Sequence, residues 1–360
     1  MLKKLIQSLR SPLRRTKHPR STPEVLGSSQ HSLRRTRMSR NAVNVVERLQ
    51  KAGYQAFVVG GCVRDLLLDL EPKDYDVATS ATPEQVRAEF RNSRIIGRRF
   101  KLAHVHFGRE IIEVATFRAN HPVDEDDKNS NLASSNESGR ILRDNVYGSL
   151  EDDAQRRDFT INALYCDVST ERIYDYAHGV HDIRNRLIRL IGDPEQRYIE
   201  DPVRMLRAIR FAAKLDFDIE EHTAAPIPKL APMLRDIPAA RLFEEVLKLF
   251  LSGYAEETFE LLVDYGLFTP LFPASGAALK HNPEYTSKLI RQALASTDLR
   301  IQQGKPVTPA FLFAALLWPA LPHRVALLQT RGMPPIPAMQ EAAHELISEQ
   351  CQRIAIPKRC

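Results

Sequence analysis

The chain has 360 residues, 43% hydrophobic and 27% charged, a composition typical of globular proteins with two or three small domains. Its four cysteines form no CxxC pair, which argues against a disulfide framework or a zinc site and favours reduced thiols in a cytoplasmic protein. We find no apolar run approaching the length of a membrane span or a secretory signal, so we expect no membrane partner.

Positive charge is concentrated at the start of the chain. Residues 1–40 hold eleven Lys or Arg and one acidic residue, Glu24, whereas the net charge of the whole chain is only +6. The segment is rich in Ser and Pro, which is typical of disordered chain. We predict a basic disordered arm, which is either a solvated tail or a segment that attracts a polyanion such as RNA.

Ordered patterns begin at residue 41. They predict, in chain order, a helix, a buried strand, a short helix, a second strand, a helix and two paired strands: residues 41–53, 55–60, 62–69, 74–79, 82–90, 103–108 and 110–118. The polar residues 119–140 predict a loop, and helical patterns dominate beyond residue 180. The sequence therefore predicts an α+β protein, a small α/β head followed by an all-helical part.

The second strand and the turn before the short helix suggest a site. Asp74 and Asp76 lie two apart on a predicted strand, so both carboxylates project from one face, where Mg²⁺ would relieve their repulsion. Such a pair alone is more often a solvated strand edge. However, Gly60 and Gly61 offer bare N–H groups to phosphates before a helix, and Arg64 lies one turn on. Together they predict a triphosphate and metal site.

Polar residues on the paired strands leave alternatives open. Glu113 alternates with apolar residues. It is either a third carboxylate, if its strand lies beside Asp76, or part of a solvated strand face. His104 and His106 share a strand face, and without an acidic or cysteine partner at suitable spacing we favour packing over a metal pair.

The segment "RRDFTINALYCD" is dense in polar residues. Asp158 is either the N-cap of a helix through Ile161 and Leu164 or part of a site. The cap leaves Arg157 and Asn162 unexplained. Because Asn162 would share the helical face of Asp158, the pair is placed to reach a ribose.

The segment "EDPVRMLRAIRF" begins a helix at Asp201 and Pro202. Arg204, Arg207 and Arg210 recur every three residues, opposite an apolar stripe. This basic face is either solvated surface or, together with Asp201, a group that reads a base edge through paired hydrogen bonds.

Five motifs in fixed order resemble the class II nucleotidyltransferase superfamily, which comprises bacterial poly(A) polymerases and tRNA CCA-adding enzymes. They are "VVGGCVRD", "DYDVAT", "RRDFTINAL", "DYAHGVHDIRNRLIRLIGDP" and "EDPVRMLRAIRFAAKL". The resemblance covers about residues 41–357. Two further segments, "GRRFKLAHVHFGREIIEVATFR" and "ILRDNVYGSLEDDAQRRDFT", are similar to the poly(A) polymerase branch.

The resemblance implies four parts and a set of site residues. The parts are the basic arm 1–40, a nucleotidyltransferase head 41–178, a helical neck with a nucleotide- and RNA-binding helix 179–250, and a helical body 251–360. Asp74 and Asp76 would hold catalytic Mg²⁺, and Asp158 would belong to the active site. The residues implied to bind the nucleotide are Gly60, Gly61, Arg64, Arg157, Asn162, Asp201, Arg204 and Arg207.

The implied activity is template-independent addition of AMP from ATP to RNA 3′ ends by two-metal transfer, with release of pyrophosphate. The resemblance also implies a cytoplasmic monomer whose tails serve the RNA-decay machinery. Family members with this pattern continue past "IAIPKR" into a further basic helical region, so we expect a chain truncated at its C-terminus. The alternatives are a CCA-adding tRNA nucleotidyltransferase and a truncated, inactive RNA-binding remnant.

Overall fold

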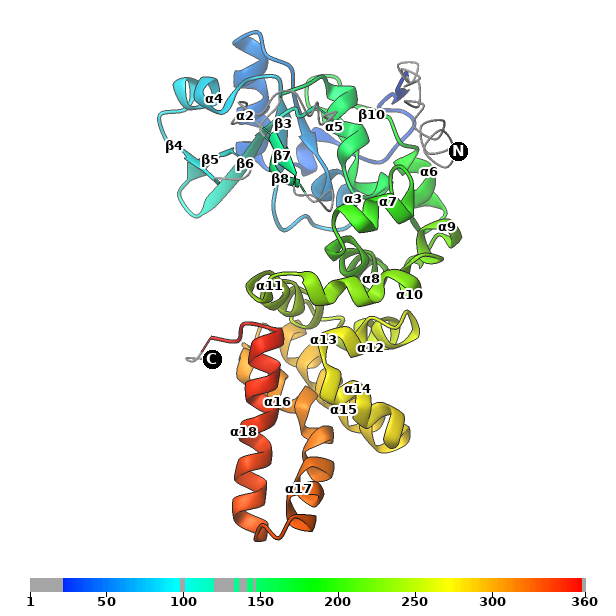
Figure 1. Ribbon diagram of the computed structural model, residues 1–360. Helices are drawn as coiled ribbons and strands as arrows, with labels where there is room; N and C mark the ends of the chain where they lie inside the picture. The colour runs from blue at the N-terminus through cyan, green and yellow to red at the C-terminus, as the bar shows by residue number, and fades with distance from the viewer. Residues whose placement is uncertain (1–21, 98–100, 120–132, 136–140, 145–146, 358–360) are drawn as a thin grey trace, which may run out of the picture.

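The computed structural model describes residues 22–97, 101–119, 133–135, 141–144 and 147–357. A mixed sheet with helices forms one end of the molecule, and helices extend away from it to form the rest (Figure 1). The predicted α+β fold, a head with a small mixed sheet followed by helices, is confirmed.

Eight strands form the sheet of the head, in the order β1-β10-β9-β2-β3-β6-β5-β4. Only β3 and β6 pair in parallel; the other neighbours are antiparallel. Their bounds are β1 Glu24–Leu26, β2 Ala56–Val59, β3 Asp76–Thr79, β4 Ser93–Ile96, β5 Leu102–Phe107, β6 Glu110–Thr116, β9 Leu164–Asp167 and β10 Arg172–Asp175. The predicted strands are therefore β2, β3, β5 and β6, and the first two are central.

The two faces of the sheet have different surroundings. One face packs on α2 (Arg40–Lys51) and α4 (Pro83–Glu89) through residues such as Val58, Val77 and Ile112. On the other face α5 (Leu150–Arg156) covers the half formed by β9, β2 and β3, where Leu150 packs with Phe57 and Tyr165. The half formed by β6, β5 and β4 carries polar side chains on that face.

Local signals explain the helices of the head. Ser39 caps α2 by accepting hydrogen bonds from the first backbone N–H groups, and Thr82 and Gln85 form a capping box at α4, with Pro83 at its first position. The predicted helices at 41–53 and 82–90 are therefore confirmed. Most of the predicted loop 119–140 lies outside the described residues, but within it Ala133–Ser135 form β7, which pairs with β8 (Ile141–Asp144).

The prediction of a disordered arm over residues 1–40 is wrong for residues 22–40. β1 pairs with β10 at one edge of the sheet, and a short 3₁₀ helix follows at Arg35–Arg37. Leu26, Leu33 and Met38 belong to the main hydrophobic core. Burial of these side chains offsets the conformational entropy that the segment loses when it becomes ordered, a loss that its polar and basic residues alone would not offset. Residues 1–21 lie outside the described part of the chain.

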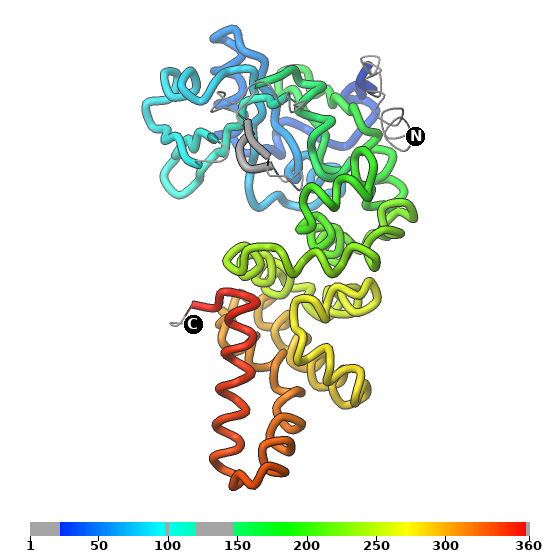
Figure 2. The backbone as a smooth tube through the Cα atoms, in the orientation of Figure 1, coloured from blue at the N-terminus to red at the C-terminus, as the bar shows by residue number. Residues whose placement is uncertain are grey.

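Helices account for most of the chain after the head, joined by short turns and the small pair β11 (Leu187–Ile188) and β12 (Asp218–Ile219). They are α6 Gly179–Arg184, α7 Pro194–Glu200, α8 Val203–Leu215, α9 Glu221–Ala224, α10 Ile227–Leu230, α11 Ala239–Phe250, α12 Ala255–Asp264, α13 Phe268–Leu271, α14 Pro273–His281, α15 Pro283–Gln302, α16 Pro309–Leu317, α17 Leu321–Thr330 and α18 Pro335–Arg353. Figure 2 shows the red C-terminal segment returning toward α11. There the Ala355 N–H donates to the Ala239 carbonyl at 3.1 Å.

One stretch has the length and apolar composition of a membrane span, so the expectation that no segment approaches one needs correction. It is Pro309–Thr330, of which 44% is buried inside the fold. The 3₁₀ turn Trp318–Ala320 divides it into α16 and α17, and Leu312, Leu316 and Leu321 are buried by neighbouring helices. A core helix has the same composition, so this stretch is weak evidence for a span.

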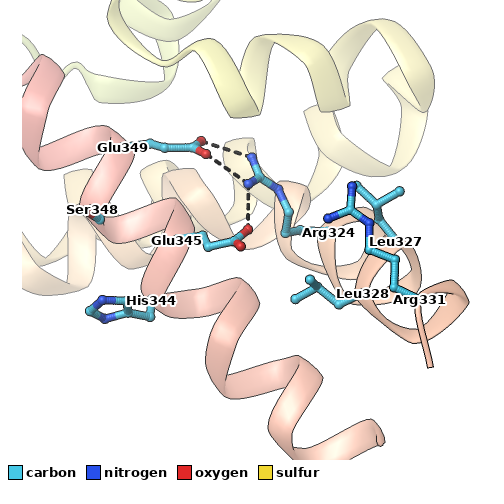
Figure 3. Close-up of a pocket in the computed structure, with 8 residues that line it drawn as sticks. All are labelled: Arg324, Leu327, Leu328, Arg331, His344, Glu345, Ser348 and Glu349. Carbon is cyan, nitrogen blue, oxygen red and sulfur yellow. Dashed lines mark hydrogen bonds and ion pairs between the residues drawn. The ribbon is translucent and has the colours of Figure 1, made fainter. Parts of the chain in front are cut away.

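Helices α17 and α18 form a hairpin at the end of the molecule far from the sheet (Figure 1). Between them lies an open pocket of about 400 Å³ (Figure 3). Arg324 spans it, with hydrogen bonds of 2.8 Å to Glu345 and of 2.9 and 3.0 Å to Glu349. Both carboxylates already pair with Arg324, and the pocket is remote from the predicted site (Figure 1).

Candidate active site

The acidic cluster lies at the start of β3. Asp76 is the first residue of β3 and is paired in register with Glu113 on the parallel strand β6. The strand placement that would make Glu113 a third carboxylate is therefore present. Asp74 lies in the bend just before β3, so the prediction that both aspartates are on the strand is wrong for Asp74.

The carboxylate of Asp76 lies close to other negative charges, which affect its pKa. Although its side chain is exposed to solvent, desolvation by the surrounding protein and repulsion from Glu113 raise its pKa to about 6, with a smaller effect from Asp74. Arg157 and His104 act in the opposite direction. A cation between these carboxylates would remove the repulsion, and carboxylate oxygens suit a hard divalent ion. Among the residues that the structure describes, no three Asp, Glu, His or Cys side chains are already arranged as a metal site.

The glycine turn links β2 to α3 (Gly61–Leu67), directly beside this cluster. Gly60 has φ +81°, a conformation that L side chains rarely adopt. A Cβ at Gly60 would lie 3.4 Å from Nη1 of Arg157, so the bare backbone lets that guanidinium approach the turn. The turn and Arg157 therefore lie together.

Arg64 is not open to solvent in this structure. Its side chain is 3% exposed, and its Nε and Nη2 donate to Oδ1 of Asp65 at 2.8 and 2.6 Å. Its Nη1 donates to Oδ1 of Asn162 at 2.6 Å. In this arrangement Arg64 is neutralised and fixes the amide of Asn162, rather than presenting its charge to a phosphate.

Asp158 lies between the head and the neck. The helix predicted to start there is wrong: residues 160–162 form a single 3₁₀ turn, and β9 begins at Leu164. Oδ1 of Asp158 accepts from the Phe159 N–H at 2.8 Å and from Nδ2 of Asn162 at 3.3 Å, while Oδ2 accepts from Nε of Arg207 at 2.7 Å. Burial alone would raise the Asp158 pKa, but Arg207 and these donors lower it to about 2.

A buried network aims Arg157 at the cluster. Nε and Nη2 of Arg157 donate to Oδ2 of Asp153 at 3.2 and 3.1 Å, and Nε also donates to the Tyr165 hydroxyl at 2.8 Å. That hydroxyl donates to the same Asp153 oxygen at 2.7 Å. Tyr165 is fully buried and Asp153 is 6% exposed, so the geometry has little freedom.

We therefore expect Tyr165→Phe to affect both stability and nucleotide binding. The ring stays, but Asp153 and Arg157 lose a buried hydrogen-bond partner, a loss of about 1–3 kcal/mol in unfolding free energy. The affinity for ATP should fall with it, because Arg157 is less constrained. Chemical denaturation and titration with ATP measure the two effects; Tyr254→Phe, at an exposed ring, is the control and should change neither.

Residues on and beside the basic face of α8 form several hydrogen bonds and ion pairs in this structure. Arg204 Nη1 donates to Glu200 at 2.9 Å and to the Arg197 carbonyl at 2.6 Å, while Asp201 pairs with Arg241 at 2.7 Å. Asp201 and Arg204 thus have separate partners and do not form the joint base-reading pair that the sequence suggests. Lys214, on the same helix, lies 3.5 Å from Asp65 of the head.

Sequence reasoning missed part of a cluster of positive charge. Burial and the neighbouring Arg118, Arg197, Arg157 and Arg204 lower the Arg156 pKa to about 9. In the described part of the chain, the Nε atoms of Arg197 and Arg210 are buried without a hydrogen-bond partner. Arginines so crowded favour a polyanion as ligand. Arg197 had no local signal, because only the fold brings α7 beside Arg156.

His104 is a neighbour of the acidic cluster. Its Nε2 lies 3.2 Å from Oε2 of Glu113, and both side chains are partly exposed. His106 lies on the same face of β5, also partly exposed, with its ring centroid 6.4 Å from that of His104. The histidines therefore lie on a partly exposed sheet face where their rings are neighbours, and Glu113 gives His104 the acidic neighbour that spacing along the sequence does not show.

Known proteins are similar to this chain in sequence and in fold. The Poly A polymerase head domain matches residues 56–189, the probable RNA and SrmB-binding site of polymerase A matches 216–279, and the polymerase A arginine-rich C-terminus matches 331–360. Among solved structures, the Bacillus stearothermophilus CCA-adding enzyme in complex with CTP is similar, with a TM-score of 0.54 and 29% identity over 86% of this chain and 83% of that one.

Relatives in sequence extend over nearly the whole chain. Poly(A) polymerase I of Escherichia coli O6:H1 is 52% identical over 93% of this chain and 72% of its own length. Poly(A) polymerase I of Haemophilus influenzae is 49% identical over 93% of this chain and 74% of its own length. A CCA-adding enzyme of Lactobacillus helveticus is 37% identical over 62% of this chain. Because the higher identity also extends over more of the sequence, the chain belongs to the bacterial poly(A) polymerase family, within a superfamily that it shares with the CCA-adding enzymes.

Proposed function

We propose that this chain adds AMP from ATP to RNA 3′ ends without a template and releases pyrophosphate, as a polynucleotide adenylyltransferase. The observation that carries the proposal is the pairing of Asp76 with Glu113 beside the arginine cluster. Carboxylates that attract a divalent cation next to a pocket of positive charge are the two parts that nucleotidyl transfer requires. Identity of 49–52% to poly(A) polymerases supports it.

The family uses a divalent metal, and we propose that here it is Mg²⁺, held by Asp74 and Asp76. Bound there, Mg²⁺ would lower the pKa of the RNA 3′-hydroxyl and stabilise charge on the departing pyrophosphate. The raised pKa of Asp76 supports this assignment, because desolvation and repulsion from Glu113 both disfavour its charged form and a bound cation would offset both.

We assign nucleotide binding to the side of Asp76 away from Glu113, where Arg157 and the glycine turn lie. Arg157, beside the Gly60–Gly61 turn, and the cluster around Arg156 and Arg197 would bind the triphosphate and stabilise its charge during transfer. Asn162, Asp158 and Arg207 would order the ribose side. For Asp201 and Arg204 to read the adenine edge, they would exchange Arg241 and Glu200 for the base.

The same proposal includes the division of the chain and its setting. The head, neck and body correspond to residues 41–178, 179–250 and 251–360, with residues 22–40 now added to the head. RNA and ATP are the partners. We also propose that the protein is a cytoplasmic monomer and that the tails it adds direct RNA to the decay machinery. The mass of the protein in solution tests whether it is a monomer.

The decisive experiment is primer extension on a short labelled RNA with Mg²⁺ and each nucleoside triphosphate in turn. A long ladder with ATP alone supports the proposal. A short addition that requires CTP on a tRNA end would move the chain to the CCA-adding branch. No extension by a folded protein that still binds ATP would identify a remnant without catalytic function.

Glu113→Gln tests the third carboxylate. It removes a charge beside Asp76 and keeps the shape of the side chain. We expect the Mg²⁺ concentration for half-maximal extension to rise about tenfold or more, and the pKa of Asp76 to fall because one source of repulsion is gone. Mg²⁺ titration of extension measures the effect. Glu110→Gln, on the same strand but on the opposite face, where Glu110 accepts from Ser39 and Asn41, is the control; an equal response in both variants would contradict the assignment.

A further inference from the structure

One half of a sheet face has no role in the site described so far. On β6, β5 and β4 the residues whose side chains share the face of Asp76 are Glu113, Ile111, His106, His104, Arg94 and Ile96, together with the apolar Ala115 and Leu102. Arg94, Ile96 and Ile111 are exposed, and both histidines are partly exposed. The buried apolar residues of these strands, such as Val105 and Ile112, point to the opposite face.

The covered half of the same face indicates what each half is for. α5 packs over β9, β2 and β3. The chain continues directly from α5 into Arg157, one of the residues proposed to bind the nucleotide. Asp76 and Glu113 lie at the boundary between the two halves. Within the described part of the chain, no helix joins a hydrophobic cluster on the β6–β5–β4 half.

Reaction geometry then places the second substrate. In phosphoryl and nucleotidyl transfer the attacking and leaving oxygens are roughly in line through the phosphorus. If the triphosphate is bound with its departing pyrophosphate toward the arginines on the α5 side of Asp76, the 3′-hydroxyl that attacks the α-phosphorus must arrive from the other side. That side is the β6–β5–β4 half of the face.

The side chains there suit single-stranded RNA. Unpaired bases stack on aromatic rings presented by a sheet, histidine included. Residues two apart on a strand are about 6.6 Å apart, and the His104 and His106 rings are 6.4 Å apart at 62° to each other. Arg94, across from His104 in the β4–β5 register, adds a positive charge for a phosphate.

We propose that the face formed by Arg94, His104 and His106 binds the last nucleotides of the RNA primer, with bases against the histidine rings and a phosphate at Arg94. This inference rests on the proposed function, since it takes the position of ATP from it. His104 also contacts Glu113. Among the described residues, the His106 ring forms no hydrogen bond or ion pair with Asp76 or Glu113, so a substitution at His106 tests RNA binding separately from the metal site.

The test is the kinetics of His106→Ala with its rescue by His106→Phe. Loss of one stacking ring should raise the KM for RNA about tenfold. The KM for ATP should change less than twofold. Phe keeps the stacking surface and should restore the KM for RNA. His222→Ala, at a histidine 86% exposed on α9, is the matched control and should change neither value. Unchanged KM for RNA in His106→Ala would overturn the proposal.

A second readout works even for an inactive enzyme. RNA with 4-thiouridine at its last or penultimate position is irradiated with the full chain, and the crosslinked peptides are mapped. Crosslinks within residues 92–113 support the proposal, and crosslinks confined to the body overturn it. Because this assay needs no turnover, failure of the adenylyltransferase proposal and failure of the RNA platform give different results. Arg94→Ala should also lower the salt dependence of RNA binding by about one phosphate contact, and Arg87→Ala on α4 should not.

Discussion

Replacing Asp76 by asparagine should reduce RNA extension by about 10³-fold or more. The substitution keeps the size of the side chain and its place beside Glu113, but it removes the charge that would hold a divalent ion. Loss of that stabilisation corresponds to about 4 kcal/mol in the transition state. Primer extension at saturating ATP and Mg²⁺ measures the effect, and ATP affinity without metal should change little or improve.

The control for this prediction is Asp69→Asn. Asp69 is in the same connection between β2 and β3, but its side chain is 71% exposed and pairs only with Arg37 at the surface. Its removal should leave extension within about twofold, since exposed pairs are worth about 1 kcal/mol or less. If Asp76→Asn retained the activity of this control, the metal assignment would be excluded.

Arg207→Ala should loosen the junction between head and neck. Asp158 is 15% exposed and accepts a pair of contacts from Arg207, so removal of the arginine leaves a largely buried carboxylate without its counter-ion. We expect local opening of residues 158–162 and α8 to become easier by about 3 kcal/mol. Amide hydrogen exchange measures it segment by segment. ATP affinity should fall as well.

The same pair predicts a pH dependence. Because the Asp158 pKa is lowered to about 2 from its ordinary value of 3.8, its stabilising contribution is complete above about pH 4 and is lost as the pH falls toward 2. In Arg207→Ala this loss should largely disappear, since the unpaired Asp158 titrates nearer its unfolded value. Arg186→Ala, at a surface pair with Asp216, is the control and should alter neither exchange nor its pH dependence. Equal protection in both variants would contradict the assigned role of the pair.

Local patterns in the sequence predicted what depends on neighbours in the chain. The glycine turn after a buried strand, the second strand with Asp76 and the capped helix at Pro83 all have signals within a few residues. The place of Glu113 beside Asp76 remained conditional, because strand order is not encoded by periodicity. The parallel β3–β6 pairing decides it.

The errors have a common physical origin in contacts between distant residues. Residues 22–40 are ordered because β1 pairs with β10, about 150 residues later. Arg64 does not present its guanidinium to a phosphate in this structure because Asp65 and Asn162 take its donors. The helix expected after Asp158 is cut short because Leu164 is drawn into the centre of the sheet as β9. In each case tertiary contacts outweighed local preference.

The strand order of the sheet has a consequence for synthesis on the ribosome. Its central strand β2 pairs with β9, and its edge strand β1 with β10, so the sheet cannot be completed until residue 175 has left the exit tunnel. At about 5–20 residues per second, the first strands wait for several seconds or more with unpaired edges. Asp76 and Glu113 come together earlier, when β6 joins β3, but Arg157, α5 and Arg207 follow. The nascent chain would thus acquire the proposed cation site before it acquires the residues proposed to hold a nucleotide or the partner that fixes Asp158, and the proposed site is complete only after the neck is made.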